Sequence, residues 1–214
     1  MSAATSSTTT ADPSSMDTKS TVSAPISLDS KKTIKPHPRV TLSSFTPNNV
    51  GTLRKLNSAI LPVAYSNKYY TEILDASLEE FNKLVYYADV PVGSISSRFE
   101  SFPPSTTTTS SSATSATSSS SSTSDLHILT LAVLPAYRSQ GLGALLLKHV
   151  LDRAQALTSP DGQKIGSVFV YCQVGNEIAR NFYVKNEFEV VDTIANYYSA
   201  RIEPRDAFLL RYRL

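Results

Sequence analysis

The feature that most restricts the fold is a strongly apolar segment, Leu126–Val133, which is followed by a glycine-containing turn and then by an amphipathic segment. The apolar segment has the length and composition of a buried strand, and apolar residues recur at helical spacing after Gly143. Such a turn exposes free backbone N–H groups at the N-terminus of a helix, where the helix dipole also favours an anion. The sequence therefore predicts an α/β domain with an anion-binding turn at Arg138–Gly143.

The residues of this turn, Arg-Ser-Gln-Gly-Leu-Gly, suit a phosphate ligand. Gly141 and Gly143 would let the backbone approach a pyrophosphate without an intervening Cβ atom, and Arg138 can add a charge-assisted contact. A P-loop would need Gly-Lys-Ser/Thr, but Ala144 follows Gly143, and a Rossmann fingerprint would need a third glycine. A purely structural loop remains the alternative at this point.

Composition divides the chain into ordered and disordered parts. Only 18% of its 214 residues are charged, below the roughly 25% typical of a globular domain. The deficit lies in two segments rich in Ser and Thr, residues 1–38 and 101–124, which cannot bury enough apolar surface to become ordered. About 150 residues remain, the size of one domain. We expect a disordered extension over residues 1–38 and a single domain over residues 39–214, interrupted by a low-complexity insertion at 101–124.

The same composition excludes several classes of protein. Cys172 is the only cysteine, which excludes a disulfide framework and a cysteine-rich zinc site, and we expect no metal. No apolar run approaches the roughly 20 residues of a membrane span. A net charge of +2 argues against bulk or sequence-specific nucleic-acid binding. We expect a monomeric protein without a membrane anchor, located in the cytoplasm or also in the nucleus.

Hydrophobic periodicity predicts alternating strands and helices. Strands are expected at 39–44, 83–87, 92–99, 126–133, 168–174, 188–193 and 208–213. Helices are expected at 46–61, with Thr46 as N-cap, at 67–74, after Gly143, and at 176–185, with Asn176 as N-cap. This order predicts a mixed, mostly antiparallel sheet flanked by helices in one α/β (α+β) domain.

Strand alternation predicts which side chains share a face of the sheet. One face of 126–133 is expected to carry His127, Leu129, Leu131 and Val133. In the strand at 168–174, Tyr171 is in phase with Phe169 and Gln173, whereas Cys172 points the other way. We therefore expect His127 and Tyr171 to be outward-facing neighbours and Cys172 to be a buried structural thiol.

Four stretches carry a resemblance to a known family: Leu56–Tyr65, Ala136–Gly143, Gln173–Tyr183 and Asn196–Pro204. With the Arg-x-x-Gly-x-Gly turn, they resemble the GNAT superfamily of acetyl-CoA-dependent N-acetyltransferases, over roughly residues 39–214 apart from the insertion. The resemblance implies the GNAT fold and, within that superfamily, transfer of acetyl to the α-amine of polypeptides that begin with Met and an apolar residue. It also implies work beside a second acetyltransferase complex, NatA, on ribosomes.

The resemblance further implies two sets of binding residues. Acetyl-CoA would be held by the strand backbone and the turn, namely Leu131, Ala132, Val133, Arg138, Ser139, Gln140, Gly141, Leu142, Gly143 and Ala144, with Asn176 and Tyr183 near the pantetheine and the thioester sulfur. The peptide would be held by Leu61, Pro62, Val63, Tyr65, Leu129, Tyr197, Tyr198 and Ile202.

The family typically places a Tyr where this chain has His127 and a His where it has Tyr171, so the pair is present but exchanged. With an ordinary pKa near 6.5, His127 is the better candidate for the base, and Tyr171 is the better hydrogen-bond donor or water-positioning group. Tyr183 is the candidate for protonating the departing thiolate. Direct attack within a ternary complex is expected, because Cys172 has no neighbour that would activate it.

Two other functions remain open from the sequence. One is a catalytically weak or dead subunit that serves as a binding module for NatA or ribosomes, although the intact Arg138, Gly141 and Gly143 argue against it. The other is an acetyltransferase acting on Lys side chains or small amines.

Overall fold

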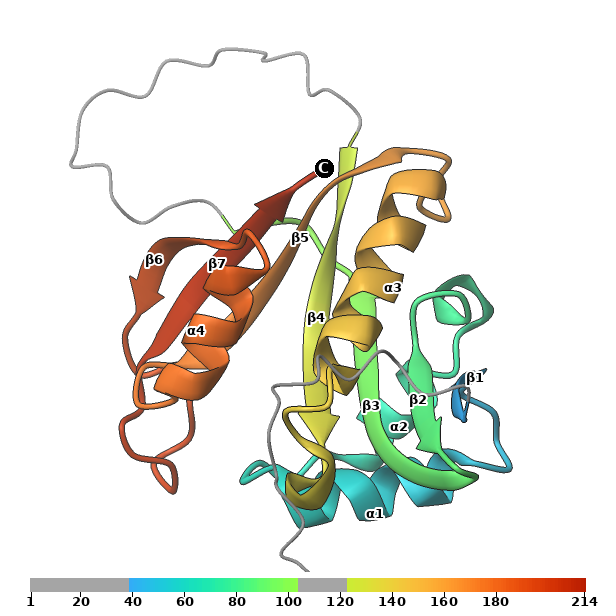
Figure 1. Ribbon diagram of the computed structural model, residues 1–214. Coiled ribbons are helices and arrows are strands. Elements are labelled where there is room, and N and C mark those ends of the chain that lie inside the picture. The colour runs from blue at the N-terminus through green and yellow to red at the C-terminus, as the bar shows by residue number, and fades with distance from the viewer. Residues whose placement is uncertain (1–38, 104–122) are drawn as a thin grey trace, which may run out of the picture. The chain divides into compact units, whose positions relative to one another are not determined.

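A computed structural model of the chain describes residues 39–103 and 123–214, and within them seven strands form one sheet in the order β1-β2-β3-β4-β5-β7-β6 (Figure 1). The strands are β1 (Val40–Ser44), β2 (Lys83–Tyr87), β3 (Val90–Phe99), β4 (Thr123–Val133), β5 (Lys164–Gln173), β6 (Glu189–Ile194) and β7 (Ala207–Arg213). Neighbouring strands are antiparallel except β4 and β5, which are parallel. The predicted mixed, mostly antiparallel sheet is confirmed.

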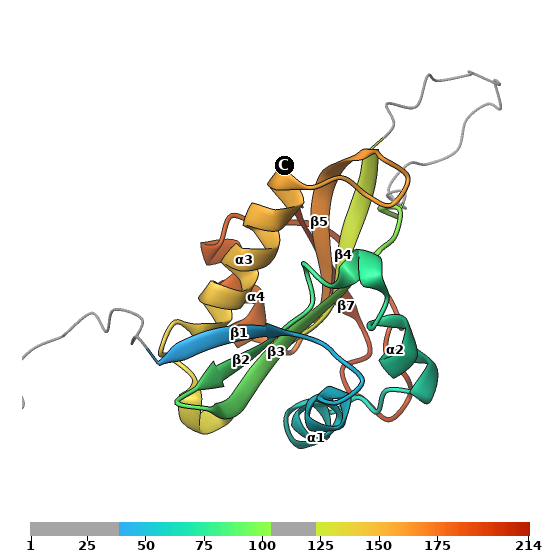
Figure 2. The same cartoon turned by 90° about the vertical axis from the view of Figure 1, so that its right-hand side faces the viewer.

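Four helices cover the two faces of this sheet (Figure 2). They are α1 (Val50–Ile60), α2 (Asn67–Glu72), α3 (Leu142–Ala156) and α4 (Glu177–Lys185), with short 3-10 turns η1 (Ala76–Leu78) and η2 (Pro135–Tyr137). The helices α1 and α2 lie on one face, where they bury Leu53, Leu56, Tyr69 and Tyr70. On the opposite face α3 and α4 bury Leu146, Leu147, Val150 and Tyr183 against the sheet. The predicted order of strands and helices is therefore confirmed.

The turn between β2 and β3 explains why these strands form a hairpin. Ala88 and Asp89 both have left-handed backbone conformations, with φ of 46° and 68°. Two successive positive φ values define the type I′ turn, whose twist matches that of the flanking strands. The predicted hairpin is confirmed, although β3 begins at Val90 rather than at Val92.

The start of α1 differs from the prediction. Asn49, not Thr46, is the N-cap, and the helix begins at Val50. The Asn49 N–H donates to Thr46 Oγ1 at 3.3 Å, and the Thr46 N–H donates to Asn49 Oδ1 at 2.8 Å. This reciprocal pair is the hydrogen-bond pattern of a capping box, and the Val50 N–H also donates to the Thr46 carbonyl at 3.0 Å. Thr46 therefore caps the turn that leads into α1, although the regular helix begins four residues later. The predicted end before Pro62 is confirmed, since Leu61 is the C-cap in an extended conformation.

A bulge in β4 corrects the predicted alternation of its side chains. Ser96 pairs with Thr130 and Ser97 with Ile128, so Leu129 has no partner across the β3–β4 ladder. Leu129 packs on the α1–α2 side, whereas Leu131 packs on the α3 side. An extra residue in one strand shifts the phase of everything after it. His127, Leu129, Leu131 and Val133 were predicted to share one face. Leu131 and Val133 instead lie on the opposite face from Leu129.

The insertion is also narrower than predicted. Thr123 and Ser124 belong to β4, where they pair with Lys164 and Ile165 of β5. Phe102 is held by the fold, because its N–H donates to Asp125 Oδ2 at 3.1 Å and its ring packs edge-to-face on Phe169 at 5.3 Å between centroids. The remaining predicted insertion, residues 104–122, and the predicted extension, residues 1–38, lie outside the described residues.

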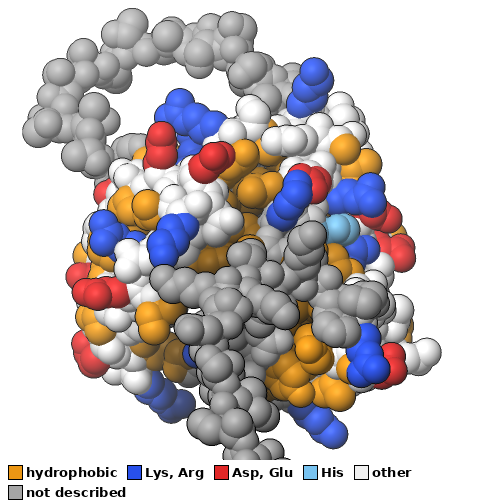
Figure 3. Space-filling model, in the orientation of Figure 1, with side chains coloured by type: hydrophobic (Ala, Val, Ile, Leu, Met, Phe, Trp, Pro, Cys, Tyr) orange, Lys and Arg blue, Asp and Glu red, His pale blue; other side chains and the backbone are white. Residues whose placement is uncertain are grey.

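On the face seen in Figure 3, basic and acidic side chains are interspersed over the part of the surface that is not grey. No large region of one charge is visible there. No helix within the described ranges is long and apolar enough to cross a membrane. Cys172 is 4% exposed and unpaired, as the strand alternation predicts for a buried thiol.

Candidate active site

The central feature of the site is the point at which β4 and β5 separate. Their parallel ladder joins residues 123–128 of β4 to residues 164–170 of β5 and ends with the pair Ile128 and Val170. Beyond it, β4 stays paired with β3 as far as Val133, and β5 stays paired with β7 as far as Gln173. In Figure 1 the two strands diverge toward their C-terminal ends. Between Leu129 and Val133 the edge of β4 that faces β5 has therefore lost its ladder partner, which leaves backbone groups for a ligand.

The predicted anion-binding turn lies directly after this edge. Gly141 is the N-cap of α3 in a left-handed conformation with φ of 80°, and Ser139 is left-handed with φ of 61°. The Leu145 N–H donates to the Gly141 carbonyl at 2.9 Å. The N–H groups of Leu142, Gly143 and Ala144 come before this first intrahelical hydrogen bond, so the helix itself offers them no acceptor.

The two glycines of the turn have different roles. A Cβ atom on Gly141 would meet nothing within 4 Å, so glycine is required there by the positive φ and not by lack of room. A Cβ atom on Gly143 would lie 3.6 Å from the Phe182 ring of α4, in ordinary contact. Neither the backbone conformation nor lack of room within the described part of the chain requires glycine at position 143, and the expected approach of its backbone to a pyrophosphate stays a prediction.

These residues fit the pyrophosphate of a coenzyme A derivative. The turn offers free N–H donors, an exposed glycine backbone and the start of a 15-residue helix whose dipole favours negative charge. Arg138 is exposed, and its Nε donates to the Val133 carbonyl at 3.0 Å, which fixes the side chain at the end of β4. Its terminal guanidinium nitrogens stay available for a phosphate oxygen.

Two of the expected acetyl-CoA residues lie on α4 on the opposite side of the strand separation. Asn176 is the N-cap of α4, and its Oδ1 accepts from the Ala179 N–H at 3.1 Å. Tyr183 is 5% exposed and packs against Phe182 and Phe188. Burial raises the pKa of Tyr183, with smaller contributions from Cys172 and Tyr198, so its hydroxyl keeps its proton.

The structure brings the predicted polar pair together. The rings of His127 and Tyr171 meet edge-to-face with 5.2 Å between centroids. His127 also stacks on Phe169 at 4.7 Å with 7° between the ring planes. Its Nδ1 lies 2.8 Å from Glu100 Oε2. The expected proximity of His127 and Tyr171 holds because the bulge at Leu129 comes after His127 and leaves its phase unchanged.

The pKa shifts of this pair follow from burial. Burial lowers the pKa of His127 below 6.5, and the hydrogen bond and negative charge of Glu100 oppose this only in part. Burial also raises the pKa of Tyr171, helped by the negative charge of Glu100. At neutral pH the imidazole is therefore neutral and the phenol protonated, which are the states required of a base and of a hydrogen-bond donor.

The loop between β6 and β7 brings Tyr197 onto this pair. The Tyr197 ring stacks on the Tyr171 ring at 4.3 Å and is 42% exposed. Two hydrogen bonds tie the loop to the end of β5: Gln173 Nε2 donates to the Pro204 carbonyl at 2.8 Å, and the Val174 N–H donates to the Asp206 carbonyl at 3.0 Å. The stacking of Tyr197 is therefore fixed by the same strand that carries Tyr171.

Tyr198 and Ile202, the other residues of this loop that are expected to bind the peptide, are more buried than Tyr197. Burial raises the pKa of Tyr198 to about 12. Ile202 is half-buried, and its N–H donates to the Ser199 carbonyl at 3.0 Å.

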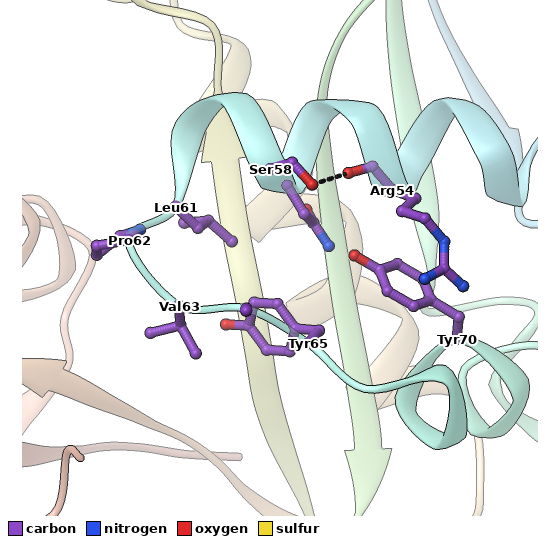
Figure 4. Close-up of a pocket in the computed structure, with 9 residues that line it drawn as sticks. Arg54, Ser58, Leu61, Pro62, Val63, Tyr65 and Tyr70 are labelled. Carbon is purple, nitrogen blue, oxygen red and sulfur yellow. Dashed lines mark hydrogen bonds between the residues drawn. The ribbon is translucent and has the colours of Figure 1, made fainter. Parts of the chain in front are cut away.

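Four of the residues expected to bind the peptide line one pocket of about 340 Å³ between α1, α2 and the loop that joins them (Figure 4). These are Leu61, Pro62, Val63 and Tyr65, and the pocket is completed by Arg54, Asn57, Ser58, Ala64 and Tyr70. Leu129, Tyr197, Tyr198 and Ile202 are not part of this lining. The Tyr65 ring contacts the Tyr69 ring at 4.5 Å between centroids, and burial, together with the neighbouring tyrosines, raises the pKa of Tyr65.

Several residues of the site were not predicted from the sequence. Glu100 and Phe169 contact His127, but Glu100 stands next to the Ser/Thr-rich insertion, and its partner depends on how β3 pairs with β4. Arg54 and Asn57 from α1 and Tyr70 from α2 also line the pocket, and no sequence motif marks them as binding residues. Within the described ranges, no three His, Cys, Asp or Glu side chains come together as a metal site.

Comparisons with known proteins place this geometry in a family. Residues 51–188 match the profile of the acetyltransferase (GNAT) family. The chain belongs to this family. It is 34% identical over 175 residues to the probable N-acetyltransferase san of Drosophila melanogaster, covering 82% of this chain and 81% of that protein. It is also 34% identical over 176 residues to N-alpha-acetyltransferase 50 of Danio rerio, covering 82% and 89%.

This GNAT protein is likewise similar to a solved structure, Arabidopsis thaliana Naa50 in complex with the bisubstrate analogue CoA-Ac-MVNAL. The sequences are 35% identical, the TM-score is 0.66, and the match covers 82% of this chain and 99% of that one. The chain is therefore a homologue of acetyl-CoA-dependent N-alpha-acetyltransferases, and its separated strands and turn correspond to a GNAT fold.

Proposed function

We propose that this chain transfers acetyl from acetyl-CoA to the α-amine of polypeptides that begin with Met and an apolar residue. The observation that carries the proposal is the 35% identity, over 82% of this chain and 99% of the other, to a Naa50 structure whose analogue joins CoA through acetyl to the peptide Met-Val-Asn-Ala-Leu. The geometry supports it in three respects. The His127 and Tyr171 rings are in contact where β4 and β5 separate. The turn before α3 offers free N–H groups, and a pocket beside α1 is lined by four of the residues expected to bind the peptide.

Acetyl-CoA supplies an acetyl group activated as a thioester. In this proposal the N–H groups at the start of α3 and the Arg138 guanidinium bind the pyrophosphate, and the free edge of β4 binds the pantetheine arm. Asn176 and Tyr183 on α4 flank the arm from the other side. Ser139 and Gly141 contribute by holding the turn in its left-handed conformations.

The demand on the base is modest. The ordinary pKa of an α-amine is about 7.7–8.0, so roughly a third of it is already neutral at pH 7.5. In the proposed reaction the amine nitrogen forms a bond to the acetyl carbon and the carbon–sulfur bond breaks. The amine proton passes to His127 directly or through a water held by Tyr171, and coenzyme A leaves as a thiolate that takes a proton from solvent. Tyr183 donates a hydrogen bond to the leaving sulfur, because its raised pKa holds the proton on the phenol.

Direct attack in a ternary complex is favoured over an acetylated cysteine. Cys172 is the only cysteine and is 4% exposed. Burial raises the pKa of its thiol to about 11, only weakly opposed by Arg180, so almost none of it is thiolate at neutral pH. A thiol in this state is a poor nucleophile.

A peptide panel tests the proposal. The peptides share one sequence except at residues one and two, and a second set carries a blocked N-terminus and one free Lys. We expect the free Met-apolar peptides to be acetylated with the highest kcat/KM and the blocked set to be inert. Preferential acetylation of the blocked Lys peptides would establish a Lys acetyltransferase instead. No acetylation of any peptide would favour the binding-module alternative.

The proposal also includes the binding partners, NatA and the ribosome, and a cytoplasmic or nuclear location. Association with NatA and the ribosome is inferred only from the resemblance to other N-terminal acetyltransferases, and cytoplasmic or nuclear location follows from the substrate. Co-sedimentation of the full chain with ribosomes at low and high salt measures the first of these, since electrostatic binding weakens as salt rises.

A further inference from the structure

Glu100 is tied to His127 by a network that no part of the proposed function requires. Glu100 directly follows β3, and its Oε2 accepts from three donors: His127 Nδ1 at 2.8 Å, Arg98 Nη2 at 2.8 Å and Arg98 Nε at 3.0 Å. His127 pairs with Arg98 across the β3–β4 ladder, so the backbone itself brings these three side chains together.

The chemistry of this bond fixes where the imidazole proton lies. An ionised carboxylate accepts hydrogen bonds and cannot donate, so the proton between Glu100 and His127 belongs to Nδ1. Partial burial raises the pKa of Glu100, but hydrogen bonds from His127 and Arg98 outweigh it and lower that pKa, which keeps the carboxylate ionised at neutral pH. A neutral imidazole with its proton on Nδ1 carries its lone pair on Nε2.

The other imidazole nitrogen, Nε2, makes no hydrogen bond within the described part of the chain. The fully buried side-chain nitrogen and oxygen atoms that lack a partner there belong to Asn57, Ser94 and Arg211, and His127 is not among them. The His127 residue as a whole is 5% exposed.

We infer that Glu100 is a positioning residue, which holds His127 in the tautomer that leaves Nε2 free to accept the proton of the attacking amine. This inference rests on the proposed role of His127 as the base. Glu100 touches the imidazole and not the reacting atoms, and Arg98 orients Glu100 through two bonds to one oxygen. Phe169, stacked on one face of the ring, restrains its rotation.

The chain supplies a matched control in a second cluster of the same composition. Glu80 lies 3.5 Å from Arg153 Nε through its Oε2, and its backbone carbonyl is 2.9 Å from His149 Nε2. The His149 tautomer is therefore fixed by the backbone, and substitution of the Glu80 side chain leaves that contact in place. The charged groups that face His127 are Glu100 and Arg98, and Tyr171 is its titratable neighbour.

The first test measures the tautomer directly on the full chain without substrate. Long-range proton–nitrogen correlations of the imidazole rings distinguish Nδ1–H from Nε2–H, and the three histidines are assigned with His127→Ala and His149→Ala. We expect the parent to show Nδ1–H at His127. Glu100→Gln and Glu100→Ala should introduce the Nε2–H form, whereas Glu100→Asp keeps a carboxylate and restores Nδ1–H in part. Glu80→Gln should leave His149 unchanged.

The second test is kinetic. Glu100→Gln should lower kcat by roughly 10-fold to 100-fold, below the 10²–10⁴ that loss of the base itself costs, with the KM for peptide and for acetyl-CoA within about 3-fold of the parent. In a His127→Ala background, Glu100→Gln should have almost no further effect, because the two residues act as a unit. Glu80→Gln should stay within about 2-fold of the parent.

Two results would overturn the inference. One is an unchanged His127 tautomer in both Glu100→Gln and Glu100→Ala. The other is an equal loss of kcat from Glu100→Gln with and without His127. Absence of peptide acetylation by the parent chain overturns the proposed function separately, because the tautomer is measured on the protein alone.

Discussion

At the scale of single residues, the two described histidines show how similar contacts serve different ends. His149 meets a backbone carbonyl, and His127 meets a carboxylate. Either acceptor can hold one tautomer, but only the negative carboxylate also stabilises the imidazolium that forms when the ring accepts a proton. Of the two, His127 is therefore the one whose surroundings suit proton transfer.

Substitution of the exchanged pair should separate its two roles. We expect His127→Ala to lower kcat by roughly 10²–10⁴ with little effect on acetyl-CoA binding, because general-base catalysis is lost. Tyr171→Phe keeps the ring that contacts His127 and removes only the hydroxyl, so it should cost less if Tyr171 orders water. His149→Ala is the control. Near-parent rates in both site variants would leave positioning and the amine pKa as the whole mechanism.

The glycine of the anion-binding turn allows a sharper test, because the chain has a second glycine with the same geometry. Gly141 and Gly162 have φ of 80° and 73°, and a Cβ atom on either would meet nothing within 4 Å. Gly141→Asp and Gly162→Asp should therefore lose similar stability, of order 1–3 kcal/mol from backbone strain. Only Gly141→Asp should abolish the rise in Tm with acetyl-CoA, since it places negative charge in the turn.

Thermal shifts of both variants with and without acetyl-CoA provide the measurement. Retention of the shift in Gly141→Asp would mean that the pyrophosphate binds elsewhere.

The sequence predicted residues whose placement depends on strand phase alone. His127 and Tyr171 meet as expected because the β4–β5 ladder is regular from Asp125 to Ile128, and its register shift lies before Asp125. Leu131 was assigned to the wrong face because a bulge is set by how two strands pair, which one strand cannot reveal. Glu100 was not predicted for a related reason, because its contact with His127 depends on how β3 pairs with β4.

At the scale of elements, the start of β4 is anchored by a cluster around the last described residues before the insertion. The Glu100 N–H donates to the Asp125 carbonyl at 3.0 Å, and the Arg211 guanidinium lies 4.1 Å from the centroid of the Phe102 ring. The Phe102 ring packs on Phe169, which in turn stacks on His127. Phe102, next to the insertion, therefore supports the His127 ring through Phe169.

Two nested deletions test this anchoring. Replacing residues 105–121 with a short Gly/Ser linker should leave turnover within a few-fold of the parent, because loop closure entropy depends only weakly on length. Replacing residues 101–124 also removes Phe102 and two β4 residues that pair with β5. The lost aromatic pair alone is worth about 0.5–1.5 kcal/mol, and we expect a lower Tm and a lower kcat. Equal behaviour of the two deletions would show that Phe102 contributes nothing.

At the scale of the whole molecule, burial of neutral histidine should make stability depend on pH. Burial lowers the pKa of both His127 and His149 below 6.5 in the folded state. The unfolded chain then binds more protons, so the stabilisation is complete above pH 6.5 and is lost as pH falls from 6.5 through the lowered values. Urea unfolding at pH 7.5 and pH 5.5 should show a smaller free energy of unfolding at the lower pH.

The matched comparison for this prediction is His127→Asn, which removes the titrating group. We expect it to reduce the difference between the two pH values. A difference of the same size in the variant would assign the effect to other groups.

The parallel ladder between β4 and β5 has a consequence for how the gene can change. The insertion enters at the N-terminal end of β4, and the strand separation begins after Ile128. About six residues of strand, or roughly 20 Å, divide the two. Mutations that lengthen or shorten the Ser/Thr tract between Phe102 and Thr123 leave the strand separation and the residues that contact His127 unchanged, so selection on catalysis should constrain the length of the tract only weakly. Related sequences should therefore vary widely in the number of residues between Phe102 and Asp125 while these two positions persist.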